Sequence, residues 1–308
     1  MALAKKGRTV RVGARGSALS RAQTAKVIAQ LQELSPETTF VFQAVKTSGD
    51  DPTSRPYGSS GVKGLFVKEI ESALLSGQID LAVHSAKDMT SLLPDGLVVS
   101  PAGERDDPGD VLVSGPNLPL DQLPAGTVVG TSSLRRSAFL QLCRPDLVIL
   151  PVRGNIETRI KKIGRECSAV ILAKAALNRL DVQSFLPADA GVFDIPLDVM
   201  APAPGQGQLA LERRDDDSFA ESLAARLERL PAALALAAER AFMSRLGLGC
   251  TAPVAAHCSL AEPDRLFMRA FLFEAGSREP KHVALSRRGD SAAEAAELGR
   301  LVASKLQE

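Results

Sequence analysis

Short apolar runs alternate with amphipathic stretches along the first two thirds of the chain. Residues 10–34 predict a short β-strand, a Gly-Ser turn and a helix with apolar residues at helical spacing. The order then recurs, with a strand at 40–45, a helix at 65–77 that closes on glycine, and a buried strand at 79–85. Strands that alternate with helices in this way indicate a mostly parallel sheet.

The same pattern restarts at residues 127–130 and continues to residue 180, which predicts a second, similar α/β lobe. Residues 196–217 mix proline, glycine and an acidic run, so we expect a crossing segment followed by a linker. Beyond it, two helical stretches, three strand-like runs and a closing helix at 291–308 predict a small α+β domain whose antiparallel sheet buries one face.

The predicted fold class is therefore α/β, with two α/β lobes and a small C-terminal α+β domain. We expect lobe 1 to comprise residues 1–103 plus about 200–217, and lobe 2 to comprise 104–199. The third domain is expected at 218–308. A chain of 308 residues with 45% hydrophobic content can bury more than one core.

Overall charge changes this picture little, because 37 Lys and Arg face 36 Asp and Glu. Near neutrality, one Tyr and no Trp argue against a nucleic-acid partner. No apolar run approaches a membrane span, and the polar, basic N-terminus does not resemble a signal peptide, so we expect a cytoplasmic protein. The four cysteines are expected to be reduced there.

Positive charge is concentrated locally, because residues 131–165 hold eight Lys and Arg against two acids. Three basic turns follow predicted strands: Arg15-Gly16-Ser17, Arg135-Arg136 and Arg153-Gly154-Asn155. Backbone N–H groups, hydroxyls and guanidinium groups at such helix starts bind carboxylate or phosphate equally well. Ligands of open α/β sheets bind beyond the carboxyl ends of the strands, so the turns are expected to face one another across an interlobe cleft.

Two further groups of residues are candidates for chemistry. Lys87 and Asp88 follow the buried strand at 79–85, where they form either a plain ion pair or a site in which Asp88 stabilises a cation or moves a proton. His84 is expected to be structural. Cys250 lies in a glycine-rich turn, which favours an exposed, reactive thiol, and its spacing to Cys258 does not support a metal site.

Taken together, these segments resemble the porphobilinogen deaminase family along nearly the whole chain. The resemblance is carried, in the family's order and spacing, by GARGSALSRAQ, KTSGD, GVKGLFVKEIESALLSGQIDLAVHSAKD, VVGTSSLRRSAFL, VRGNIETRIKKI, APGQGQLALERR and ERAFMSRLGLGC. It implies two lobes like those of periplasmic binding proteins, and a C-terminal domain that presents a cofactor cysteine. The implied protein is a monomeric transferase of heme and tetrapyrrole synthesis.

The resemblance implies a reaction and a role for each matching residue. A dipyrromethane joined to Cys250 would act as a primer, onto which four porphobilinogen molecules are condensed with loss of ammonia before hydrolysis releases hydroxymethylbilane. Asp88 would be the catalytic group. The residues implied to hold the cofactor are Lys87, Thr131, Ser133, Arg135 and Arg136. Those implied to bind substrate are Arg15, Ser17, Gln23, Arg153, Arg159 and Arg179, and Asp50 and Lys63 would flank a lid loop.

Three departures from the family pattern and one alternative accompany this interpretation. Ser59 occupies a lid position where a lysine is frequent, and residues 253–257 lack the glycine and tyrosine that usually follow the cofactor cysteine. Thr90 stands where a proline commonly follows the Lys-Asp pair of the family, which bears on the rigidity of that loop. The alternative is a non-catalytic, two-lobed solute-binding protein for a carboxylate or an oxyanion. It would use the same lobes but would need neither the third domain nor an exposed cysteine.

Overall fold

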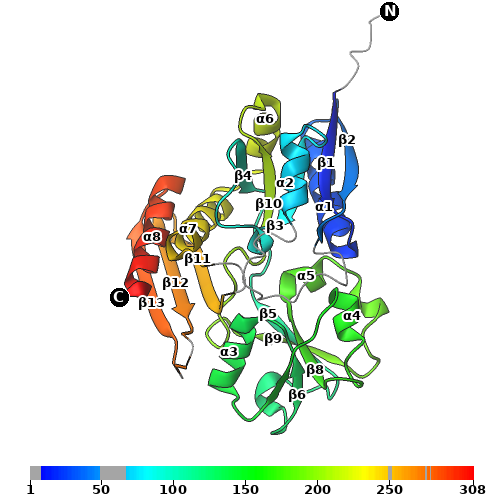
Figure 1. Cartoon of the computed structure of the whole chain (residues 1–308), viewed down its shortest axis with the longest axis vertical. Coiled ribbons are helices and arrows are strands. Elements are labelled where there is room, and N and C mark those ends of the chain that lie inside the picture. The colour runs from blue at the N-terminus through cyan, green and yellow to red at the C-terminus, as the bar shows by residue number, and fades with distance from the viewer. Residues whose placement is uncertain (1–7, 49–66, 249–251, 275, 278) are drawn as a thin grey trace, which may run out of the picture.

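The computed structural model describes residues 8–48, 67–248, 252–274, 276–277 and 279–308. Figure 1 shows lobe 1 above lobe 2, with the third domain beside both. Among the described residues, no helix has the length and apolar character needed to span a membrane.

Lobe 1 is a five-stranded sheet of order β2-β1-β3-β10-β4, in which β10 alone runs antiparallel to its neighbours. Its elements are β1 (Thr9–Arg15), α1 (Ala18–Leu34), β2 (Thr39–Val45), α2 (Lys68–Leu75), β3 (Leu81–Ser85), the 3-10 turn η2 (Ala86–Asp88), β4 (Leu97–Pro101), β10 (Leu209–Arg214) and α6 (Ser218–Leu227). The prediction of a mostly parallel sheet is confirmed.

Lobe 2 repeats this plan with the order β7-β6-β8-β5-β9, where β5 is the antiparallel strand. Its elements are β5 (Asp110–Ser114), η3 (Leu120–Gln122), β6 (Val128–Gly130), α3 (Leu134–Cys143), β7 (Val148–Leu150), α4 (Ile156–Ile160), β8 (Ala169–Ala173), α5 (Lys174–Asn178), η4 (Val182–Ser184) and β9 (Gly191–Ile195). The two lobes therefore have the arrangement that the resemblance implied.

The third domain packs two helices on one face of an antiparallel sheet of order β11-β12-β13. Its elements are α7 (Leu230–Leu246), β11 (Val254–Glu262), β12 (Arg265–Leu272), β13 (Lys281–Arg288) and α8 (Ala292–Gln307). Side chains alternate along β12, so that Met268 and Ala270 enter the domain core, while Phe271 and, just after the strand, Phe273 pack edge-on against Phe139 of α3. The sheet thus joins this domain to lobe 2.

The segment at 196–217 crosses from lobe 2 to lobe 1 as expected, but its second part is not a linker. It contains β10, whose first four residues are buried and which pairs with β3 on one side and β4 on the other. The helix that follows also belongs with lobe 1, since Leu223 and Leu227 of α6 pack in the same core as Val12 and Leu31. We therefore place the start of the third domain at α7 rather than at residue 218.

Candidate active site

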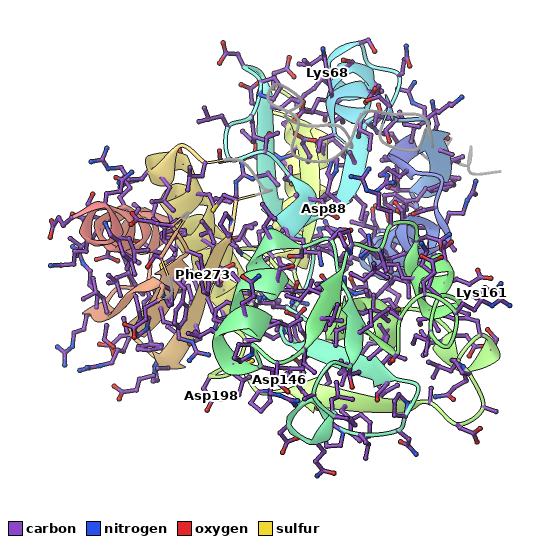
Figure 2. All side chains as sticks on the ribbon, turned by 60° about the horizontal axis from the view of Figure 1, so that its bottom comes forward. Lys68, Asp88, Asp146, Lys161, Asp198 and Phe273 are labelled. Carbon is purple, nitrogen blue, oxygen red and sulfur yellow. The ribbon has the colours of Figure 1, made fainter. Side chains whose placement is uncertain are left out.

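A cavity of about 1070 Å³ lies where the three parts of the chain meet. Lobe 1 contributes the ends of β1 and β3, lobe 2 contributes the starts of α3 and α4, and the third domain contributes α7. Figure 2 shows Asp88 at the junction of the two lobes. The expected residues that line this cleft are Arg15, Ser17, Lys87, Asp88, Ser133, Arg135, Arg136, Arg153 and Arg159.

Asp88 and Lys87 reach the cleft because β3 ends in the short turn η2 instead of continuing into a helix. The Asp88 side chain is exposed to the cleft. Lys87 is more enclosed, and its Nζ donates to Oε1 of Gln206 at 3.3 Å. Burial lowers the pKa of Lys87 to about 8, although the neighbouring Asp88 carboxylate opposes this shift.

Side-chain hydrogen bonds, instead of a proline ring at position 90, hold the loop after Asp88. The hydroxyl of Thr90 donates to the carbonyl of Leu92 at 2.6 Å. From the third domain, Arg240 of α7 donates to the carbonyls of Thr90 and Ser91 at 3.1 and 3.3 Å. The first bond holds the loop internally, and the other two tie it to α7 of the third domain.

At the start of α3, two arginines share one carboxylate. Ser133 caps the helix, and Nη2 of Arg135 and Nη2 of Arg136 lie 2.6 and 2.7 Å from the two oxygens of Asp110. Both guanidinium groups are buried, and they hold the pKa of Asp110 well below its usual range despite its burial. We call Arg135, Arg136 and Asp110 the double-arginine cluster. Its net charge of one positive unit lies against the cleft.

The double-arginine cluster also retains unused donors. Arg135 donates to the carbonyl of Ala201 at 2.5 Å and Arg136 to that of Ile171 at 2.8 Å. Within the described part of the chain, however, Nε of each arginine is buried without a hydrogen-bond partner. Buried N–H groups without partners are costly, so the cluster is suited to an anionic ligand.

The other two basic turns line the same cleft from opposite lobes. Ser17 caps α1 directly after Arg15 and β1. In lobe 2, Asn155 caps α4, and Arg159 folds back so that its Nε donates to the carbonyl of Gly154 at 2.8 Å. Arg153 is exposed at the same edge. The expectation that all three basic turns face one cleft is confirmed.

Three expected residues lie outside the cleft lining. Thr131 is buried and accepts from the backbone of Ser133 at 3.2 Å, so it supports the turn before α3. Gln23 is buried beneath the lobe 1 surface and bonds to Ser85 at 3.1 Å. Nε of Arg179 lies 3.3 Å from Oδ2 of Asp106.

The remaining expected residues, Cys250, Asp50 and Lys63, lie outside the described residues. What the structure describes is the flanks of the cysteine turn: α7 ends at Gly247 in the left-handed conformation, and Leu248 and Ala252 both line the cleft. His84 is structural as expected, since it is buried with its Nε2 2.9 Å from Glu212. No group of three metal-ligating side chains occurs in the described ranges.

Sequence reasoning missed two buried acids that organise this site. Asp110 begins the buried strand β5, and Glu239 is a buried acid within the otherwise apolar face of α7. Glu239 pairs with Arg105 at 2.7 Å and accepts from the backbone of Gly205 at 2.5 Å and of Cys258 at 2.8 Å. An acid inside an apolar run was a signal that could have identified Glu239, whereas Asp110 follows a polar, acidic stretch and carries no such signal.

Two family models match the chain. The one described as "Porphobilinogen deaminase, dipyromethane cofactor binding domain" matches residues 10–222, and "Porphobilinogen deaminase, C-terminal domain" matches 233–308. Similar proteins named porphobilinogen deaminase occur in Roseiflexus sp. (strain RS-1), at 41% identity over 97% of this chain and 95% of that protein. Another occurs in Syntrophus aciditrophicus, at 46% identity over 80% of this chain and 79% of that protein.

Solved structures give more distant matches. The sulfate-bound regulatory domain of an OxyR2 mutant from Vibrio vulnificus matches at a TM-score of 0.43 and 13% identity, over 73% of this chain and 97% of that chain. The BenM effector-binding domain with benzoate matches at a TM-score of 0.45 and 11% identity, over 72% of this chain and 91% of that chain.

Proposed function

Because the chain belongs to the porphobilinogen deaminase family, we propose that the cleft between its lobes is where a tetrapyrrole-forming transferase carries out its chemistry. The enzyme condenses four porphobilinogen molecules, with loss of ammonia, onto a dipyrromethane primer and then releases hydroxymethylbilane by hydrolysis. The observation that supports the location most strongly is an exposed carboxylate, Asp88, in the same cleft as the guanidinium groups of Arg15, Arg135, Arg136, Arg153 and Arg159.

The residues present fit a dipyrromethane, whose two pyrrole rings carry carboxylates. Lys87 offers an ammonium group, Ser133 a hydroxyl, and the double-arginine cluster its excess positive charge to the cleft wall. Thr131 supports this wall from beneath. Cys250 is the proposed attachment residue, between flanks that line the same cleft. When bound, the dipyrromethane supplies the nucleophilic pyrrole carbon to which the first substrate is joined.

Asp88 is the proposed catalytic residue. Positive charge develops on the pyrrole of porphobilinogen as its amino group leaves, and a fixed carboxylate stabilises that charge where it forms. The Asp88 side chain is suited to this role because it is exposed to the cleft and follows the buried strand β3, which anchors its backbone. The cations around it orient the carboxylates of the substrate, so that binding and charge stabilisation use different side chains.

Arg15, Arg153 and Arg159, together with Ser17, are proposed to bind incoming substrate at the mouth of the cleft. Each added unit brings an acetate and a propionate, and guanidinium groups bind carboxylates through two parallel hydrogen bonds while keeping their charge. Gln23 and Arg179 do not line the cleft, so a role for them is proposed only through the side chains they support.

The test begins with the mass of the purified, denatured protein. We expect the wild type to exceed its sequence mass by two condensed pyrrole units and the Cys250→Ser variant to match its bare sequence. With porphobilinogen, Asp88→Asn should keep its fold but lose activity by roughly 10²–10³-fold, because it removes charge and keeps shape. Asp198→Asn is the matched control, since Asp198 is exposed on lobe 2 outside the cleft lining.

Either of two results would contradict the proposal: release of no ammonia from porphobilinogen by the primed wild type, or near-normal turnover by Asp88→Asn. The first would reject the activity, and the second would reject only the role of Asp88. The cytoplasmic location and the monomeric state expected from the sequence stay predictions, and light scattering of the purified protein tests the second of these.

A further inference from the structure

A single buried amide joins the cationic groups of the two lobes. Gln206 is 1% exposed and lies on the segment that leads from lobe 2 back into β10. Its Oε1 accepts from Nζ of Lys87 at 3.3 Å, and its Nε2 lies 2.9 Å from Oδ1 of Asp110. The carbonyl oxygens of Pro108 and Gly109 lie 2.7 and 3.2 Å from Nε2, so its two protons are shared among these carbonyls and Asp110.

The orientation of this amide follows from its partners. Three acceptors surround Nε2, and a carbonyl oxygen placed there would face them without a proton to share. Oε1 must therefore face Lys87, whose ammonium group can only donate. The result is a continuous chain of bonds from Lys87 through Gln206 to Asp110, and from Asp110 to the two arginines of α3.

The backbone on either side of Gln206 is shaped so that its side chain reaches both lobes. Gly205 and Gly207 have φ angles of +75° and +87°. A Cβ atom at Gly205 would lie 2.8 Å from the backbone nitrogen of Lys87, and one at Gly207 would lie 2.3 Å from the carbonyl oxygen of Asp106. Only glycine permits this close approach, because other residues would be strained in conformation and would clash.

We propose that Gln206 is a positioning residue that sets Lys87 of lobe 1 in register with the double-arginine cluster of lobe 2, so that the carboxylates of one bound ligand meet both. The inference rests on the proposed function for its ligand, and the bonds themselves are independent of it. Gln206 contacts the ligand-binding groups through its amide, while the third domain holds its neighbour Gly205 through Glu239. All three domains therefore converge on this residue.

A positioning role has a consequence that a purely structural role lacks, namely control over the protonation of Lys87. Besides Gln206, the charged groups that act on Lys87 are Asp88 on its own turn, Asp110 on β5, and Arg135 and Arg136 on α3. The Gln206 carbonyl accepts from the charged form of Lys87 and so stabilises it. Removing that acceptor should lower the pKa of Lys87, and replacing it with a carboxylate should raise it.

The experiment compares Gln206→Met and Gln206→Glu with a matched control, Gln208→Met. Gln208 is similarly buried two residues along the chain, but among the described residues its Nε2 donates only to the carbonyls of Gly103 and Leu209. Each change is made in the full-length Cys250→Ser protein, so that no primer is attached. Acetic anhydride labels the neutral amine of Lys87, and peptide mass spectrometry across a pH series gives the midpoint of labelling.

We expect Gln206→Met to lower this midpoint and Gln206→Glu to raise it, each by on the order of one pH unit. Gln208→Met should leave it unchanged, although thermal unfolding should show a comparable loss of stability. In proteins that retain Cys250, Gln206→Met should also reduce the primed fraction measured by intact mass, and Gln208→Met should not.

A Lys87 midpoint that stays at the wild-type value in both Gln206 variants would overturn the inference, as would an equal shift in Gln208→Met. If Gln206→Met does not fold, Gln206→Asn decides: its shorter amide keeps N–H donors near Asp110 but withdraws the acceptor oxygen from Lys87, so the labelling midpoint should fall. Failure of the proposed function appears separately, as a primed wild type that releases no ammonia from porphobilinogen.

Discussion

Each lobe has one antiparallel strand in a mostly parallel sheet, and each of these strands carries a buried carboxylate. In lobe 2 this is Asp110 on β5, which two arginines share. In lobe 1 it is Glu212 on β10, which is paired with His84 and lies near a second buried acid, Glu71. The topology is therefore similar, while the balance of buried charge is opposite.

The two lobes therefore differ in where their unmatched buried charge lies relative to the cleft. The lobe 2 cluster has more cations than acids and lines the cleft, so its unmatched charge is available to an anionic ligand. Glu71 and Glu212 do not line the cleft, and the fold keeps their negative charge away from the ligand. Two similar sheets thus place a buried cluster with excess positive charge against the cleft in lobe 2 and buried acids away from it in lobe 1.

The largest expected effect comes from breaking the lobe 2 cluster. Asp110→Asn leaves two buried guanidinium groups without a counter-charge, so we expect the free energy of unfolding to fall by about 3–5 kcal/mol. Urea unfolding of the primer-free protein measures this. Asp146→Asn is the control: its pair with Arg144 lies at the surface, where solvent screens the interaction, and the loss should be much smaller. Equal losses in the two variants would contradict the comparison.

The pH dependence of stability gives a second test of the contribution of Asp110. The arginines lower the folded-state pKa of Asp110, so its contribution is fully present above its unfolded pKa of about 3.9 and is lost as pH falls towards the folded value. The difference in unfolding free energy between wild type and Asp110→Asn should therefore be constant near neutral pH and shrink below about pH 4. A difference that grew on acidification would show that the sign is wrong.

A smaller effect is expected for the acid of lobe 1. Glu212→Gln keeps a hydrogen-bond acceptor for His84 and removes a charge that the cleft does not use, so stability should fall by about 1–2 kcal/mol. Turnover of porphobilinogen by the primed enzyme should remain near that of the wild type. A large loss of turnover with a small loss of stability would mean that lobe 1 also contributes buried charge to the site.

The smallest effect should be a gain. Burial raises the pKa of Glu71, and the neighbouring Glu212 carboxylate raises it further. The folded state therefore disfavours ionised Glu71, and this cost appears as pH rises above its unfolded pKa of about 4.3. Glu71→Gln should raise the free energy of unfolding near neutral pH by less than about 1 kcal/mol. Thermal unfolding at neutral and at acidic pH checks that the gain disappears in acid.

Local sequence predicted the elements whose signals are contained within a few neighbouring residues. The strand and helix at 10–34, the turn and helix start that carry Arg135 and Arg136, and the antiparallel sheet of the third domain were all predicted correctly. The strand at 191–195 was not assigned, and β10 was taken for part of a linker. β10 is a strand because β3 and β4, more than a hundred residues earlier, pair with both of its edges.

The candidate site divides in the same way. The residue types that gather at strand ends could be predicted from the sequence, since a basic turn before a helix is a local pattern, and so could the family, through motifs of the same kind. That Arg135 and Arg136 share Asp110, and that Gln206 bonds to Lys87 across 119 residues, follows from long-range contacts of the fold. Charge balance in a buried cluster depends on which side chains the fold brings within hydrogen-bond distance. A local sequence pattern cannot predict those contacts, because the partners lie far apart along the chain.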